Sequence, residues 1–171
     1  ANRKLQQLSM SDGLTGIANR RCFDERLAEE WVRHAQDRRS LALLLVDVDC
    51  FKPLNDARGH LHGDECLRVL ATVCIGVLRD PDELLARYGG EEFAVVLPEA
   101  DAGAARLIAE KIREVVEQTP FSFNDIQYPV TVSLGVASTS RDEELGVNAL
   151  TSRADASPHH AKGTAGNTAA G

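Results

Sequence analysis

The chain has 171 residues, of which 43% are hydrophobic and 26% are charged, and this balance is typical of one soluble globular domain. Its net charge of -7 repels nucleic acid and anionic membranes at long range, although a local basic pocket could still hold a small anion. No apolar run approaches 18 residues, so we expect a cytoplasmic domain with no nucleic-acid partner and no direct membrane contact.

The first part of the chain predicts two helices and a strand. Residues 1–10 place leucines among polar helix formers, which is typical of the end of a stalk helix that begins further upstream. After a turn-rich stretch, apolar residues recur at helical spacing over 19–35. Residues 41–49 are too short and too uniformly apolar for an amphipathic helix, so they predict a strand covered on both faces.

The middle of the chain predicts a polar connection, a helix and a β-hairpin. Residues 50–65 are polar and contain glycines, and apolar residues then recur at helical spacing from 66 to about 80. Two short apolar runs follow, joined by Gly89 and Gly90. A two-glycine joint between such runs is typical of a hairpin.

A further helix and a strand complete a single domain over residues 11–171. The apolar spacing predicts a helix over 101–118, and residues 128–138 alternate in the manner of a half-buried strand. Helices and strands that interleave around one hairpin indicate a mixed β-sheet flanked by helices. We therefore predict a ferredoxin-like or palm-like α/β fold.

Acidic residues gather where the predicted strands end. Asp47 and Asp49 close the buried strand, and Glu91 and Glu92 follow the two glycines of the hairpin. If these strands are neighbours, the acids crowd one edge of the sheet, where a hard cation such as Mg²⁺ would relieve their repulsion and bind phosphates. The alternative is that the two glutamates are simply solvated. The glycines favour a ligand, because a backbone without side chains lets a nucleotide lie directly on it.

Several motifs resemble those of one known family. The signature "GGEEF" at residues 89–93 resembles that of GGDEF domains, the diguanylate cyclases that make cyclic di-GMP from GTP. "DGLTGIANRR" at 12–21 is similar to the N-terminal motif of the family, and "DVDCFKPLNDARGHLHGDECL" at 47–67 is similar to its central motif. "VSLGVA" at 132–137 fits as well. The resemblance covers roughly residues 10–165 and implies the palm-like fold of nucleotidyl cyclases.

The resemblance implies a catalytic metal site for Mg²⁺ or Mn²⁺. By this resemblance Asp47 and Glu91 are ligands through their carboxylates, and the carbonyl of Val48 supplies a further oxygen. Asp49 and Glu92 stand next in line to hold a second ion, which would suit an in-line displacement at phosphorus.

The resemblance also implies a guanine site. The family reads guanine with an asparagine and an aspartate, here Asn55 and Asp64, and a carboxylate suits the N1 and N2 donors of guanine better than the N1 acceptor of adenine. Leu14 and Phe51 would supply apolar walls near the base. The alternatives are that Asp64 caps the following helix and that Leu14 and Phe51 belong to the core.

The phosphates of GTP would rest on the chain as it leaves the buried strand. Consecutive amides of Cys50, Phe51 and Lys52 would form an anion nest, and the Lys52 ammonium would add a catalytic positive charge. Gly89 and Gly90 would form the floor of the nucleotide site. Taken alone, Lys52 is more typical of an ordinary surface lysine.

The implied reaction joins two GTP molecules into cyclic di-GMP and releases pyrophosphate. Because one domain holds one GTP, two domains must face each other, so the resemblance implies an active homodimer. An upstream sensory domain would control that pairing through the stalk helix.

The last family motif is only partly present. The chain reads "ADASPHHAKGTAGNT" from 154 to 168, which keeps Lys162 as a phosphate contact but has Pro158 inside the expected helix and Gly166 where the family has arginine. This departure favours slow turnover. It also supports an alternative function, in which a degenerate domain binds GTP or cyclic di-GMP as a regulatory module without turnover.

Many family members carry a product-inhibition site shortly before the signature. Arg79 and Asp82 have the required R-x-x-D spacing, but they lie one residue out of register with the signature. We therefore expect product inhibition to be absent or weak.

Overall fold

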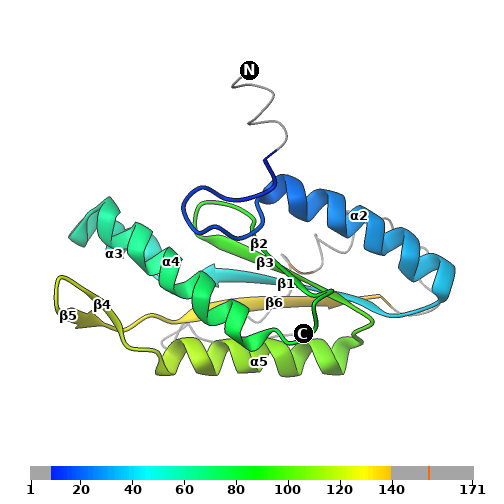
Figure 1. Ribbon diagram of the computed structural model, residues 1–171. Helices are drawn as coiled ribbons and strands as arrows, with labels where there is room; N and C mark the ends of the chain where they lie inside the picture. Colours follow the sequence, from blue (N-terminus) through cyan, green and yellow to red (C-terminus); the bar gives the residue numbers. More distant parts are fainter. Residues whose placement is uncertain (1–8, 140–153, 155–171) are drawn as a thin grey trace, which may run out of the picture.

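The computed structural model describes residues 9–139 and Ala154. Four helices and six strands lie in this part of the chain (Figure 1). The helices are α2 (Arg20–Asp37), α3 (Phe51–Arg58), α4 (His60–Val77) and α5 (Ala102–Gln118). The strands are β1 (Leu41–Val48), β2 (Leu84–Arg87), β3 (Glu92–Pro98), β4 (Phe121–Phe123), β5 (Ile126–Tyr128) and β6 (Val132–Ser138).

A four-stranded sheet in the order β2-β3-β1-β6 forms the centre of the fold. Its three ladders are antiparallel, and a parallel bridge between Ala18 and Ala86 adds the N-terminal segment to its edge. A separate small sheet pairs β4 with β5. The α/β fold with flanking helices is therefore confirmed.

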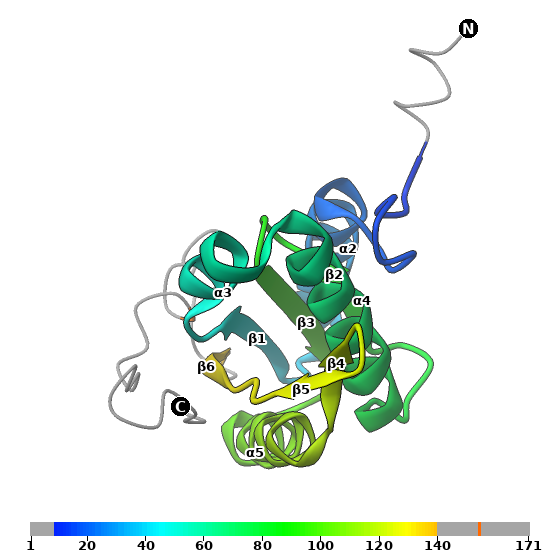
Figure 2. The same cartoon turned by 90° about the vertical axis from the view of Figure 1, so that its left-hand side faces the viewer.

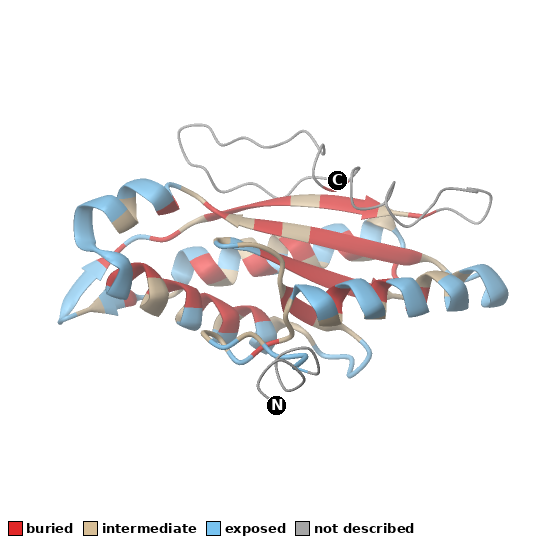
Figure 3. Ribbon diagram, turned by 90° about the horizontal axis from the view of Figure 1, so that it is seen from above, coloured by how far each residue is buried: buried red, intermediate tan, exposed pale blue. Residues whose placement is uncertain are grey.

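Each face of the central sheet packs against a different set of helices (Figures 1 and 2). Alternate residues of β1, such as Leu44 and Val46, join a core with α4 and α5. The residues between them, such as Leu43, pack with Phe23 and Leu27 of α2. Consequently β1 is buried along nearly its whole length (Figure 3), which is why its sequence is uniformly apolar.

The strongly patterned segments form the predicted elements. The helix predicted over 19–35 is α2, which begins after Asn19, whose side chain accepts a hydrogen bond from the amide of Cys22 at 2.9 Å. The helix predicted over 101–118 is α5, which Asp101 caps in the same way. The predicted hairpin is β2 and β3.

The polar connection predicted over residues 50–65 was wrong, because it contains α3 and the first turns of α4. Pro53 lies in the first turn of α3, where the missing amide hydrogen is not needed by the helix. Gly59 joins the two helices with a φ of 91°, a conformation that favours glycine. These two features hid α3 and the first turns of α4 from a prediction based on apolar spacing.

The strand predicted over residues 128–138 is shorter than expected and more deeply buried. It forms as β6, which begins at Val132, and Ser133 and Ala137 on its second face are buried as well. The residues before it form the β4–β5 hairpin, which the sequence analysis did not predict.

His62 of α4 is a buried histidine beneath the β4–β5 hairpin. It is 2% exposed, and its ring centroid lies 4.9 Å from that of Phe123 and 4.1 Å from that of Tyr128. Burial lowers the pKa of His62, and the nearby charge of Arg58 lowers it further.

We predict that His62 makes the domain less stable in mild acid. As pH falls below the ordinary histidine pKa of about 6.5, the unfolded chain binds a proton that the folded chain resists, so the free energy of unfolding should drop between pH 7.5 and 5.5, by at most about 1.4 kcal/mol from this one group. Urea unfolding of the wild type and of His62→Phe at both pH values measures this. An equal loss in the two proteins would contradict the prediction.

Candidate functional site

A pocket of about 500 Å³ lies where β1 ends, between helices α3 and α4 and the turn that joins β2 to β3. The residues that line it are Phe51, Asn55, Asp64, Leu67, Arg87, Gly90, Glu91 and Glu92. Five of them were predicted as site residues from the sequence, and Glu92 was a candidate for a second ion. Leu67 and Arg87 were missed, because Leu67 lies in the apolar stripe of a helix and nothing in its spacing separates it from the core.

The side chains of Asn55 and Asp64 come from the two consecutive helices. Asp64 lies inside the first turns of α4, whose N-cap is Gly59, so the alternative that Asp64 caps the helix is wrong. Asn55 belongs to α3, and its Nδ2 lies 3.1 Å from Nδ1 of His60. The Oδ1 atom of Asn55 is buried and has no hydrogen-bond partner within the described part of the chain.

Gly63 allows α3 and α4 to lie close together. A Cβ atom at this position would come within 2.1 Å of Oδ1 of Asn55 and 3.1 Å of Cζ of Phe51. Any side chain here would therefore displace Asn55 from its present position beside Asp64. The close packing of the two helices depends on this glycine.

The acidic side of the pocket is built by the pairing of β1 with β3. Asp47 lies directly opposite Glu92 in the ladder, and the amide of Val48 donates to the carbonyl of Glu91 at 3.4 Å. The register therefore brings the acid that ends β1 beside the two acids of the signature. Val48 itself is 3% exposed, and neither Val48 nor Asp47 is among the residues that line the pocket.

Asp49 faces β6 and is held there by two hydroxyl groups. Its carboxylate accepts hydrogen bonds from Oγ1 of Thr131 at 2.9 Å and from Oγ of Ser133 at 2.6 Å. These contacts give Asp49 a structural role at the end of β1. No three His, Cys, Asp or Glu side chains converge on one point within residues 9–139, so a cation here would also need backbone or ligand oxygens.

The N-terminus of α3 opens beside the acidic residues. Cys50 is exposed and adopts a left-handed conformation with φ 56°, which turns the chain sharply from β1 into the helix. The amides of Phe51 and Lys52 belong to the first helical turn, whose N–H groups have no acceptor inside the helix. Lys52 is exposed, whereas Phe51 is 9% exposed and serves both as core residue and as pocket wall.

Neither glycine of the signature is required by the backbone conformation of the turn. Gly89 and Gly90 both lack a positive φ, and the hairpin that they were predicted to join is present. A Cβ at Gly90 would meet no described atom within 4 Å, and one at Gly89 would approach Oε2 of Glu92 to 3.2 Å. At Gly90 a side chain would instead enter the space of the pocket.

Other predicted residues lie away from the pocket lining. Leu14 is partly buried and packs against the core, in agreement with the alternative interpretation of it. Lys162 and the altered motif around it lie outside the described residues.

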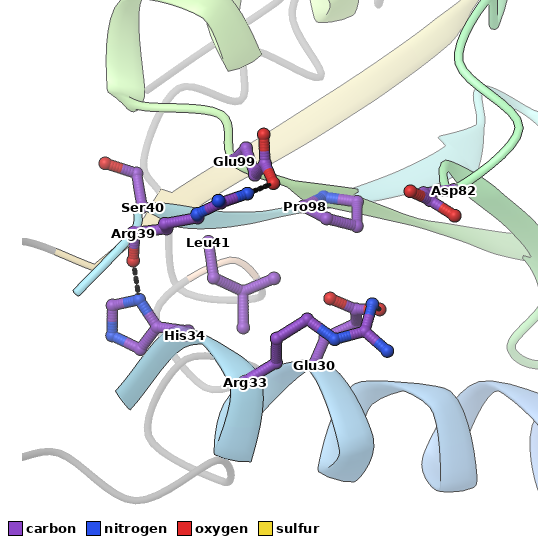
Figure 4. Close-up of a pocket in the computed structure, with 9 residues that line it drawn as sticks. All are labelled: Glu30, Arg33, His34, Arg39, Ser40, Leu41, Asp82, Pro98 and Glu99. Atoms are coloured by element: carbon purple, nitrogen blue, oxygen red, sulfur yellow. Dashed lines mark hydrogen bonds and ion pairs between the residues drawn. The ribbon is translucent and has the colours of Figure 1, made fainter. Parts of the chain in front are cut away.

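The structure places the two predicted product-inhibition residues, Arg79 and Asp82, in different surroundings. A pocket of about 20 Å³ lies between α2 and the residues around Asp82 (Figure 4). Glu30 and Arg33 of α2 line one side of it, and Asp82 lines the other. Arg79 is not among the residues that line this pocket, and the carbonyl of Asp82 accepts a hydrogen bond from Arg26 at 3.1 Å. Weak or absent product inhibition stays a prediction.

Comparison with known proteins places the chain in one family. The family described as "Diguanylate cyclase, GGDEF domain" matches residues 9–168. Diguanylate cyclase DgcP of Pseudomonas aeruginosa is 37% identical over 157 residues, which are 92% of this chain and 23% of DgcP. The response regulator PleD of Caulobacter vibrioides is 37% identical over 167 residues, which are 96% of this chain and 36% of PleD. The chain therefore belongs to the GGDEF diguanylate cyclase family.

A solved structure has the same fold. The GGDEF domain of DgcB from Caulobacter crescentus, in complex with c-di-GMP, has a TM-score of 0.81 and 34% identity, and the match covers 87% of this chain and 87% of that one. The chain spans between about a quarter and a third of DgcP and PleD, at 23% and 36% of their lengths. In the described residues, no helix is long and apolar enough to cross a membrane.

We predict that two glycines of α4 respond in opposite ways to alanine. Gly76→Ala should raise the free energy of unfolding by up to about 1 kcal/mol, because its Cβ meets no described atom and alanine favours a helix. Gly63→Ala should lose this gain and displace the side chain of Asn55. Thermal unfolding and the NMR signals of the Asn55 side-chain amide measure both effects, and stabilisation of Gly63→Ala with unmoved Asn55 signals would contradict the packing argument.

Proposed function

We propose that this domain condenses two molecules of GTP into cyclic di-GMP and releases pyrophosphate. One observation carries the proposal: a single pocket brings Asn55 and Asp64 of the helices together with Glu91 of the signature turn. Its volume of about 500 Å³ is in the range of small-molecule sites. The solved DgcB domain, which is similar in fold, contains c-di-GMP and supports the choice of nucleotide.

The helix side of the pocket suits guanine. Asp64 can only accept hydrogen bonds when ionised, and guanine offers N1 and N2 donors, whereas adenine offers an acceptor at N1. Asn55 is held beside Asp64 by the close approach at Gly63 and by its contact with His60. A carboxylate that can only accept, next to an amide that is held in place, favours GTP over ATP.

The strand side of the pocket suits a divalent cation, which we propose to be Mg²⁺ or Mn²⁺. The carboxylates of Asp47 and Glu91 and the carbonyl of Val48 would hold it, and the β1–β3 register brings these residues to one edge of the sheet. All three groups are hard oxygen donors, which these ions prefer, and phosphate oxygens and waters would complete the shell. When bound, such an ion neutralises negative charge on the phosphates.

The contribution of the chain itself is mainly to position the nucleotide. The amides of Cys50, Phe51 and Lys52, together with the Lys52 ammonium, would hold phosphates at the start of α3. Gly90 leaves open space over the turn, so the ligand can approach its backbone. Correct placement of the 3'-hydroxyl of one GTP against the α-phosphorus of another accounts for much of the rate in such reactions.

The reaction requires two copies of the domain. The pocket beside Asn55, Asp64 and Glu91 would hold one GTP in each copy, so we propose that two domains face each other with two-fold symmetry and each contributes one GTP. DgcP and PleD are both much longer than this chain, and PleD is named a response regulator. We therefore also propose that an upstream sensory domain controls the pairing in the whole protein.

A second candidate function is a regulatory domain that binds GTP or cyclic di-GMP without turnover. The observation that favours it is the replacement of the expected arginine by Gly166 and the proline at position 158. Arginine forms bidentate, charge-assisted hydrogen bonds to phosphate, so its loss weakens the hold on the leaving group. Incubation of the chain with GTP and Mg²⁺, followed by detection of cyclic di-GMP, separates the two functions.

We predict that Glu91→Gln lowers cyclic di-GMP synthesis by at least about 100-fold, because it removes a charge from the metal site. The melting temperature should stay within a few degrees of the wild type, since Glu91 lies in a turn outside the core. Glu114→Gln, an exposed change on α5, is the control and should retain wild-type synthesis. Full synthesis by Glu91→Gln would exclude Glu91 as a ligand.

We predict that Asp64→Ser relaxes the choice of base, because a hydroxyl group can donate or accept where a carboxylate only accepts. The ratio of GTP to ATP affinity should fall by roughly tenfold, which corresponds to the loss of about one charged hydrogen bond. Competition binding with both nucleotides measures the ratio. If discrimination against ATP is unchanged, the base does not lie against Asp64.

A further inference from the structure

The N-terminal segment holds the signature turn at several points. Residues 11–19, which we name the N-terminal strap, close on themselves through a bridge between Ser11 and Ala18. The carbonyl of Ala18 accepts a hydrogen bond from the amide of Arg87 at 2.9 Å. Immediately after the strap, Arg20 stacks over the ring of Tyr88 at 3.8 Å from its centroid. The strap is therefore bonded to the residues that lead into the two glycines.

The side chain of Arg87 joins the strap to the turn itself. Its Nε and Nη2 atoms both donate to the carbonyl of Gly90, at 3.2 and 2.8 Å. Its Nη1 atom donates to both carboxylate oxygens of Asp12, each at 3.3 Å. The guanidinium thus spans from the strap to the backbone of the signature, and few of its five N–H groups are left for a ligand.

Asp12 is fixed in turn by its own segment. Its carboxylate accepts hydrogen bonds from the amide and the hydroxyl of Thr15, at 2.9 and 2.7 Å. Burial would raise the pKa of Asp12, but the Thr15 hydrogen bonds and the charge of Arg87 outweigh it and hold the pKa below its usual range. The Asp12 and Arg87 side chains are only 17% and 21% exposed, so solvent screens this pair less than a surface pair.

We propose that Arg87 is a positioning residue, which sets the Gly90 carbonyl and hence the adjacent Glu91 through its ion pair with Asp12. Arg87 reaches the pocket wall, but its contacts are with the protein backbone and with Asp12. The effect of Arg87 on catalysis rests on the proposed function. The connection that Arg87 makes between the N-terminal strap and the signature turn rests only on the hydrogen bonds described above.

The test compares Arg87→Ala, Arg87→Lys, Asp12→Asn and the Asp12→Asn/Arg87→Ala double variant. Amide hydrogen exchange is measured at Tyr88 and Gly89, which donate to the carbonyl of Glu92, and at Leu44 in the β1–β3 ladder as an internal reference. Loss of a charged hydrogen bond should speed exchange at Tyr88 and Gly89 by about tenfold or more relative to Leu44. Arg87→Lys should not restore the wild type, because an ammonium lacks the planar fork.

A matched control is Arg113→Ala on α5. Arg113 has a side chain that is 20% exposed and pairs with Glu110 and Glu117, so it resembles Arg87 in burial and charge partners but lies far from the signature in the sequence. It should leave exchange at Tyr88 and Gly89 unchanged. Equal acceleration in Arg113→Ala, or unchanged exchange in Arg87→Ala, would overturn the proposal.

Turnover gives the second readout. If Arg87 acts through position, Asp12→Asn should lower kcat although Asp12 does not line the pocket, and the double variant should be no slower than Arg87→Ala alone. A raised KM in Arg87→Ala with a silent Asp12→Asn would make Arg87 a direct phosphate ligand and overturn the positioning role. If the wild type makes no cyclic di-GMP, the proposed function is wrong. The hydrogen-exchange experiment still tests whether Arg87 connects the N-terminal strap to the signature turn.

Discussion

The antiparallel pairing of β1 with β3 is the constraint on which the site depends. Because side chains alternate along a strand, a slip of one residue would carry Asp47 to the opposite face of the sheet. The register is held by the apolar residues of β1, which must fill a core on each face at the same time. The requirement for two cores therefore also fixes the place of an acid next to the signature.

The helical half of the pocket depends on close packing at one point. Gly63 lets α3 lie against α4, because a side chain at this position would run into Asn55. The strand half and the helical half are joined where the chain leaves β1 at Cys50 and turns into α3. A nucleotide that contacts both halves would therefore depend on two packing contacts, the β1–β3 pairing and the α3–α4 contact at Gly63.

The sequence was sufficient to predict helices and strands whose apolar pattern is long or uniform. It was insufficient where a contact between distant residues determines the local structure. The apolar run of β1 and the stripes of α2 and α5 follow from burial, which leaves a periodic trace in the sequence. The helix α3 was missed because its eight residues are too few to show a period and contain Pro53.

The candidate site was predictable in the same uneven way. The family resemblance supplied Asn55, Asp64 and Glu91, and the structure brings them to one pocket. Arg87 was missed because its partner Asp12 is distant in the sequence, and no local pattern records a contact of that range. A signal was nevertheless present, since both residues lie in or beside quoted motifs and carry opposite charges.

The strand order also has a consequence for the synthesis of the chain. Both neighbours of β1 come later in the sequence, and β6 is the last strand of the described chain. An emerging polypeptide therefore carries a mostly apolar strand with both edges unpaired until β3 has been translated, and with one edge unpaired until β6 follows. Such long-range pairing slows folding, and exposed apolar edges bind to other chains. Premature truncation anywhere before Val132 would leave β1 with an open edge and make the fragment prone to aggregate.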